Sequence, residues 1–190
     1  HKTTGPVSVL YANALQCSPA DGWRIEGTPE DGWRINGTGK DVTVVAYSHM
    51  AHEARRAMEI LAKIPAHPNG AGVSCELFDP VWLRPLPCLP AVAESVATTK
   101  RLLVVDCGWT TCGIGAEIVA GVAERVPIEN RVGRLGFAET PCPTSKALEN
   151  LYYPTAATIA AKAYEMVTGK KIPAQPNGAG PEVEGFRGPF

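Results

Sequence analysis

The sequence predicts an α/β domain whose sheet is largely parallel and covered by helices on both faces. Leu102 to Val105 is an uninterrupted apolar run, as expected of a strand buried on both sides. Asp106 to Gly108 ends this run, and Gly113 and Gly115 then allow a tight turn before helical spacing over Ala116 to Ala123. Strand-like and helix-like segments alternate along the chain, which is typical of βα units with right-handed crossovers.

The first βα unit of the domain follows Gly39. Asp41 to Ala46 predicts a strand, and Ser48 is the expected N-cap of the next helix. In that helix apolar residues recur at helical spacing between charged ones, namely Met50, Ala54, Ala57, Met58 and Leu61. Val73 to Asp79 predicts the second strand.

The remaining elements come after two prolines, Pro85 and Pro87, that break the chain. Ala91 to Thr99 predicts a short helix that leads into the strand at Leu102. Arg131 to Gly136 predicts a further strand, and Thr155 to Thr168 a last amphipathic helix. Its inward residues are Ile159, Ala163, Met166 and Val167.

Size and composition restrict the class of protein. With 190 residues, 45% apolar residues and a formal net charge of −1, the chain can form one domain with a real core, and neither whole-chain disorder nor nucleic-acid binding is indicated. No segment reaches the roughly 20 apolar residues that span a bilayer. The six cysteines include no CxxC pair, so we expect a reducing compartment. From the composition and the net charge we expect any partners to be protein surfaces. Because the chain opens with His1, we expect a piece of a longer polypeptide.

Two near duplications occur outside the predicted helices and strands. DGWRIEGT at residues 21–28 recurs as DGWRINGT at 31–38, and KIPAHPNGAG at 63–72 recurs as KIPAQPNGAG at 171–180. Neither period is sustained over three units, which excludes a solenoid. We interpret the PNGAG pieces as exposed loop and tail sequence, and residues 169–190 as a flexible tail.

One turn could bind an anion. Gly113, Ile114 and Gly115 open a helix directly after a strand, where free backbone N–H groups can hold phosphate. A dinucleotide fingerprint would need Gly or Ala at position 118, where the chain has Ile118. Close packing of the helix against the sheet is the alternative and the simpler interpretation.

No catalytic set of residues follows from the sequence. His49 and His52 are one helical turn apart, but they match neither HExxH nor its inverted form and lack a third ligand. Cys107 and Cys112 are too far apart in sequence for the CxxC geometry that lowers a thiol pKa. A GxSxG nucleophile elbow is absent from the sequence. We therefore assign no catalytic, cofactor-binding or metal-binding residue.

Four separated motifs, in order, resemble one family. They are GKDVTVVAYS at 39–48, VSCELFD and LRPL within 73–86, TKRLLVVDCGWTTCGIGAEI at 99–118, and TPCPTSKALENLYYP at 140–154. Over residues 39–168 the chain resembles the C-terminal domain of the transketolase superfamily. Within that superfamily it is most similar to the beta subunit of thiamine-diphosphate-dependent 2-oxo acid dehydrogenases of the pyruvate dehydrogenase type.

The resemblance implies a three-layer α/β/α sandwich around a mixed, mostly parallel five-stranded sheet. Its first strand, antiparallel to the others, would be Trp33 to Asn36. It also implies the domain limits: residues 1–20 are the tail of a preceding pyrimidine-binding domain, 21–38 a linker with the first edge strand, and 39–168 the C-terminal domain itself.

The resemblance implies that this domain serves the assembly of the enzyme rather than catalysis. In that family thiamine diphosphate and Mg are held by other domains, so we expect no cofactor on this chain. The implied partners are the alpha subunit, a second beta subunit and the acyltransferase core, in the cytoplasm or, in a eukaryote, the mitochondrial matrix. Trp109, Tyr152 and Tyr153 are candidate interface anchors, with packing inside the domain as the alternative.

Two rival functions remain at this point. The same domain could belong to another superfamily member, such as transketolase, deoxyxylulose-phosphate synthase or acetoin dehydrogenase. The chain could also be an independent α/β module that binds an anion at the turn of residues 113–117.

Overall fold

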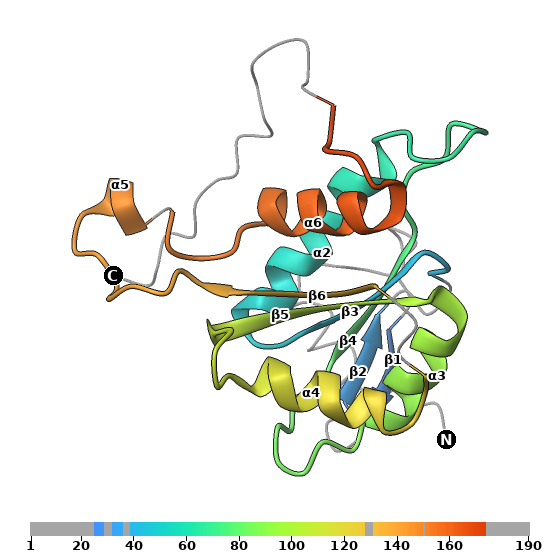
Figure 1. Cartoon of the computed structure of the whole chain (residues 1–190), viewed down its shortest axis with the longest axis horizontal. Helices are drawn as coiled ribbons and strands as arrows, with labels where there is room; N and C mark the ends of the chain where they lie inside the picture. The colour runs from blue at the N-terminus through green and yellow to red at the C-terminus, as the bar shows by residue number, and fades with distance from the viewer. Residues whose placement is uncertain (1–24, 29–31, 36–38, 128–130, 150, 174–190) are drawn as a thin grey trace.

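The computed structural model describes residues 25–28, 32–35, 39–127, 131–149 and 151–173 (Figure 1). The strands are β1 Ile25–Thr28, β2 Gly32–Ile35, β3 Val42–Ala46, β4 Cys75–Asp79, β5 Arg101–Trp109 and β6 Arg131–Phe137. The helices are α2 His49–Ala62, α3 Leu89–Thr99, α4 Ile114–Ala123, α5 Lys146–Glu149 and α6 Ala156–Thr168. Apart from the short helix α5, the order of strands and helices from β3 to α6 is the one that the sequence predicts.

The described strands form one mixed sheet in the order β1-β2-β4-β3-β5-β6. From β4 to β6 all neighbours are parallel, and β2 pairs with β4 antiparallel, which confirms the mixed sheet. The sheet has one strand more than the five expected, because β1 pairs with β2 in a hairpin. The register, with Ile25 opposite Ile35, pairs the second half of DGWRIEGT with residues 32–35 of DGWRINGT, so residues 25–28 and 32–35 of the stretch interpreted as a linker form the edge of the sheet.

The helices cover the sheet in two layers. In Figure 1, α2 and α6 lie on one side of the strands, and α3 and α4 on the other. The core is divided in the same way: one apolar cluster joins the sheet to α2 and α6, and a second joins it to α3 and α4. The three-layer α/β/α sandwich is therefore confirmed.

Two local predictions need correction. Ser48 is the N-cap residue of α2, as predicted, but it has φ 55° and its side chain makes no capping hydrogen bond. Asp106 to Gly108 do not end a strand: after an irregularity in the ladder β5 continues to Trp109, which pairs with Phe137 of β6. The apolar run marks only the part of β5 that is buried on both faces, whereas backbone pairing with β6 extends further.

The ends of α6 follow the predicted chemistry of helix termini. Thr155 and Thr158 form a reciprocal capping box, and Gly169 ends the helix in the left-handed region at φ 71°. Beyond it, Ile172 packs against the core under α2 and α6.

The predicted tail of the preceding domain, residues 1–20, and most of the predicted C-terminal tail lie outside the described residues. In the part of the chain that is described, no helix combines the length and the apolar character that a membrane span requires.

Candidate functional site

The turn between β5 and α4 is closed by a carboxylate of the chain itself. Asp106 is 3% exposed, and its Oδ2 accepts a hydrogen bond of 2.9 Å from the backbone N–H of Gly115 in the first turn of α4. Its Oδ1 accepts a second hydrogen bond from the hydroxyl of Tyr47, which follows β3. A carboxylate at a helix N-terminus satisfies free N–H groups and the positive end of the helix dipole. At the predicted anion-binding turn, Asp106 takes the place that an external anion would have.

The glycines of this turn allow a close approach of backbone and carboxylate. A Cβ on Gly113 would lie 2.1 Å from the carbonyl oxygen of Trp109 and 2.6 Å from Oδ2 of Asp106. A Cβ on Gly115 would lie 3.3 Å from Cγ1 of Val104 in β5. Ile118, which stands where the dinucleotide fingerprint needs a small residue, is buried in the core under α4. This geometry favours the packing interpretation of the turn.

Tyr47 links the ends of β3 and β5. Its hydroxyl donates to Asp106 and accepts from the backbone N–H of Cys107 at 3.3 Å, while the Cys107 thiol donates to the Tyr47 carbonyl at 3.1 Å. Burial, with the hydrogen bond to Asp106 adding to it, raises the pKa of Tyr47. Burial also raises the pKa of the Cys107 thiol. Both groups therefore stay protonated at neutral pH, and neither is an activated nucleophile.

The two histidines of α2 form no metal site with neighbouring side chains. The rings of His49 and His52 stack with their centroids 6.1 Å apart, and burial lowers the pKa of His52. Among the described residues no group of three His, Cys, Asp or Glu side chains could hold a metal ion. The five described cysteines form no disulfide.

The three predicted interface aromatics lie at the carboxyl ends of β5 and β6 but differ in exposure. Tyr152 is 6% exposed and packs with Phe137 and Tyr153, with ring centroids between 4.9 and 5.2 Å apart. The hydrogen bond with Cys142 raises the pKa of Tyr153 to about 12. Trp109 is 51% exposed, and its indole N–H donates to the carbonyl oxygen of Ala138 at 3.1 Å. Tyr152 thus packs within the domain, whereas Trp109 exposes apolar surface.

Sequence reasoning missed the exposed leucines of the α5 segment. Leu148 and Leu151 are 56% and 79% exposed, at α5 and directly after it. α5 projects from the end of the sheet in Figure 1. The signal was present in ALENLYYP, where leucines three residues apart stand in a segment too short to bury them.

Sequence reasoning also missed a buried chain of polar side chains beneath α3. Arg34 of β2 pairs with Glu76 of β4, which accepts a hydrogen bond of 2.7 Å from Ser95 of α3. Ser95 and Thr99 each lie 2.7 Å, oxygen to oxygen, from the hydroxyl of Thr43 in β3. Because every member is bonded to the next, the chain connects the edge hairpin to the centre of the sheet and has no open position for a ligand.

Comparisons with known proteins agree with this architecture. Residues 31–159 match the family described as "Transketolase, C-terminal domain". The beta subunit of acetoin:2,6-dichlorophenolindophenol oxidoreductase from Cupriavidus necator is 38% identical over 135 residues, which are 70% of this chain and 38% of that protein. The mitochondrial pyruvate dehydrogenase E1 beta subunit of Pisum sativum is 38% identical over 118 residues, 61% of this chain and 31% of that protein.

Among solved structures, a split-gene transketolase described as an inactive beta4 tetramer superposes with a TM-score of 0.59. The match has 23% sequence identity and covers 70% of this chain and 41% of that one, so it shows the fold. The chain spans roughly a third of the length of the curated relatives that it matches. On the family match and the six-stranded α/β/α architecture, the chain belongs to the transketolase C-terminal domain family.

Proposed function

We propose that this chain is the C-terminal domain of the beta subunit of a thiamine-diphosphate-dependent 2-oxo acid dehydrogenase of the pyruvate dehydrogenase type. Its relatives at 33–38% identity are named as beta subunits of pyruvate dehydrogenase E1 and of an acetoin oxidoreductase. In the complete enzyme the domain supports oxidative decarboxylation of a 2-oxo acid through assembly, without catalytic residues of its own.

This proposal rests on which side chains at the carboxyl edge of the sheet are hydrogen-bonded and which are exposed. Ligands of open α/β sheets bind at this edge, and here Asp106, Tyr47 and Cys107 are all bonded to one another or to the backbone. At the same edge Trp109, the last residue of β5, exposes apolar surface. An edge with satisfied polar groups and exposed apolar side chains suits contact with another protein surface.

The described residues do not fit thiamine diphosphate with Mg²⁺. A magnesium diphosphate needs several oxygen ligands in octahedral arrangement. Within the described ranges no cluster of acidic side chains offers them, and Asp106 is occupied by Tyr47 and Gly115. We propose that the cofactor is held by other parts of the enzyme.

The partners follow from the same proposal. They are the alpha subunit, a second beta subunit and the acyltransferase core, in the cytoplasm or the mitochondrial matrix. The proposed limits of the domain are residues 39–168, after an edge segment at 21–38 and the end of a pyrimidine-binding domain at 1–20, with a tail at 169–190.

The assembly role is tested in the complete beta subunit that contains this domain, expressed with its alpha subunit. Trp109→Ala is expected to weaken tetramer formation at least tenfold by analytical ultracentrifugation, because it removes exposed aromatic surface. Leu83→Ala, a truncation of a half-buried side chain in the loop after β4, is the control. Unchanged assembly of the Trp109 variant removes this surface from the interface. Decarboxylation of pyruvate by the isolated 190-residue chain overturns the proposal itself.

A second candidate is an acetoin dehydrogenase of the same superfamily. It is favoured by the acetoin oxidoreductase relative, whose match extends over 135 residues against 118 for the pea protein. Dichlorophenolindophenol reduction by the assembled enzyme, with pyruvate and with acetoin in parallel, distinguishes the two. The remaining rival, an independent anion-binding module, predicts heat on titration of this chain with inorganic phosphate. We expect none, since Asp106 fills the turn.

A further inference from the structure

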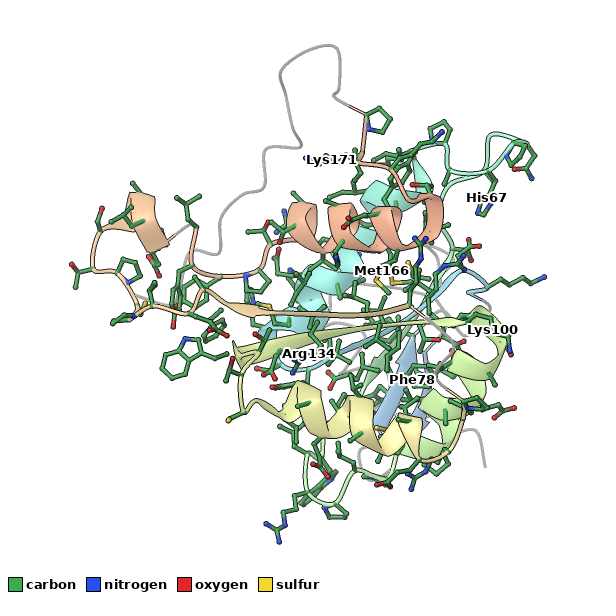
Figure 2. The ribbon with its side chains drawn as sticks, viewed as in Figure 1. His67, Phe78, Lys100, Arg134, Met166 and Lys171 are labelled. Carbon is green, nitrogen blue, oxygen red and sulfur yellow. The ribbon has the colours of Figure 1, made fainter. Side chains whose placement is uncertain are left out.

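Positive charge gathers at the amino edge of the sheet, where the parallel strands begin, opposite to the edge that holds Asp106. Lysines and arginines stand directly before or at the start of three neighbouring strands, β3, β5 and β6, and after the end of α6. These exposed or half-buried cations are Lys40, Lys100, Arg101, Arg131 and Lys170. Figure 2 shows Lys100 at this end of the sheet, on the right of the view.

Two of these cations, Arg101 and Arg131, hold their guanidinium groups side by side. Nε of Arg101 donates to the carbonyl oxygen of Met166 at 3.0 Å, and Nη1 of Arg131 donates to the same oxygen at 3.3 Å. Nη1 of Arg101 also donates to the carbonyl oxygens of Asp41 and Thr99, at 3.2 and 3.3 Å. Because these bonds fix both groups in the free protein, a ligand that binds them loses little free energy in ordering them.

The two arginines form no ion pair with any described carboxylate. The acidic side chains that belong to this edge are engaged elsewhere. Oδ2 of Asp41 accepts from the backbone N–H of Ser74 at 2.8 Å and lies 3.0 Å from Nε2 of His67. The carboxylate of Glu165 pairs with Lys162 at 3.1 Å. The carboxyl end of α6 supplies only about half a negative charge, so two full positive charges leave an excess beside it.

We propose that this amino edge binds an acidic polypeptide segment of a partner protein, with one carboxylate held by Arg101 and Arg131. Nε and Nη2 of Arg131 have no hydrogen-bond partner among the described residues, and such a fork donates two parallel hydrogen bonds to a carboxylate.

The arrangement of the cations selects an extended chain of carboxylates as the occupant. Neighbouring strands lie about 4.8 Å apart, so the strand beginnings of β3, β5 and β6 place Lys40, Lys100 and Arg131 in a row along the edge. A row of exposed cations suits successive acidic side chains of one segment. The inference does not depend on the proposed function, which uses the opposite edge of the sheet.

Fluorescence anisotropy of a labelled polyglutamate peptide, titrated with the 190-residue chain, tests the inference. We expect saturable binding at low ionic strength that weakens as salt is added, because the contact joins exposed charges. Arg131→Gln is expected to weaken binding about tenfold, since it removes a charged pair of donors. Arg131→Lys keeps the charge without the fork, so we expect an intermediate affinity. Arg134→Gln, which removes an exposed arginine of the same strand outside this surface, is the matched control and leaves the affinity unchanged.

Three results overturn the inference: a wild-type chain that does not bind polyglutamate at low ionic strength, equal losses of affinity in the two glutamine variants, or full affinity in Arg131→Lys. Calorimetric titration with tripolyphosphate examines the other source of oxyanions. Binding of tripolyphosphate that depends on Arg131, without binding of the peptide, identifies a phosphate site and rejects the polypeptide occupant.

A second variant keeps the test decisive if Arg131→Gln disturbs the fold, which circular dichroism shows. Lys170→Gln changes an exposed side chain beyond the end of α6, and we expect it to weaken binding of polyglutamate about threefold. Unchanged affinity in this variant contradicts the extent of the proposed surface.

Discussion

The hydrogen bond between Tyr47 and Asp106 gives the sharpest test of how the carboxyl edge of the sheet is held together. Replacement of Asp106 by Ala removes a buried carboxylate and leaves the Tyr47 hydroxyl and the Gly115 N–H without their acceptor. Each hydrogen bond to a charged group contributes about 1.5–3 kcal/mol. Part of this is offset because the carboxylate no longer has to be desolvated. We expect Asp106→Ala to lower the free energy of unfolding by about 3–5 kcal/mol.

Tyr47→Phe removes the same hydrogen bond from the other side. It also leaves the Cys107 N–H without the phenol oxygen, so we expect a loss of about 2 kcal/mol. Because both variants delete one shared interaction, the double variant should lose less than the sum, by about 1.5–3 kcal/mol. Urea unfolding followed by circular dichroism measures all four proteins, with unchanged m-values as the check that the transition is comparable.

This double-mutant cycle of Asp106 and Tyr47 has one outcome that contradicts the reasoning. If the losses add to within about 0.5 kcal/mol, the two residues are energetically independent, and the account of the β5–α4 turn given above is wrong. Asp106→Asn keeps the shape of the side chain but removes its negative charge. Its side chain can still accept from Gly115 and donate to the Tyr47 oxygen, so we expect about half the loss of the alanine variant.

Further predictions concern other parts of the core. Burial raises the pKa of Cys75 to about 12, so above pH 9 the unfolded chain loses a proton that the native state keeps, and the free energy of unfolding falls with rising pH. We expect Cys75→Ala to make this fall shallower by up to about 1.4 kcal/mol per pH unit, as measured by urea unfolding at a series of pH values. Gly113→Ala should lower the free energy of unfolding by about 2–4 kcal/mol, because its Cβ would lie 2.1 Å from a carbonyl oxygen. Gly108→Ala is the milder control, since its Cβ would meet only a carboxylate oxygen at 3.4 Å. Equal losses of stability in the two variants contradict the steric argument. Arg34→Met leaves the buried carboxylate of Glu76 without its cation and should lower the free energy of unfolding by about 3 kcal/mol. We expect amide hydrogen exchange to be faster in β2 than in β5 of this variant. Uniform exchange would contradict a role of Arg34 in holding the edge hairpin.

The helices and parallel strands could be predicted from local patterns because those patterns reflect burial on one or both faces. The apolar run of β5 and the spacing in α2 and α6 place these elements correctly. The edge hairpin has no such signature. β1 and β2 are short, and each contains a glycine. They are strands because β1 pairs with β2 and β2 pairs with β4, which is distant in sequence.

The α/β class, the order of most elements and the family resemblance follow from the amino-acid sequence alone, because periodicity, turn residues and motifs are local properties. Which side chains are exposed and which are bonded to one another depends on the tertiary structure. Asp106 and Tyr47 satisfy each other across two strands, Tyr152 is buried, and Trp109 stays exposed. Exposure and pairing depend on which elements come together in space, and that is set by packing between segments that are far apart in the chain.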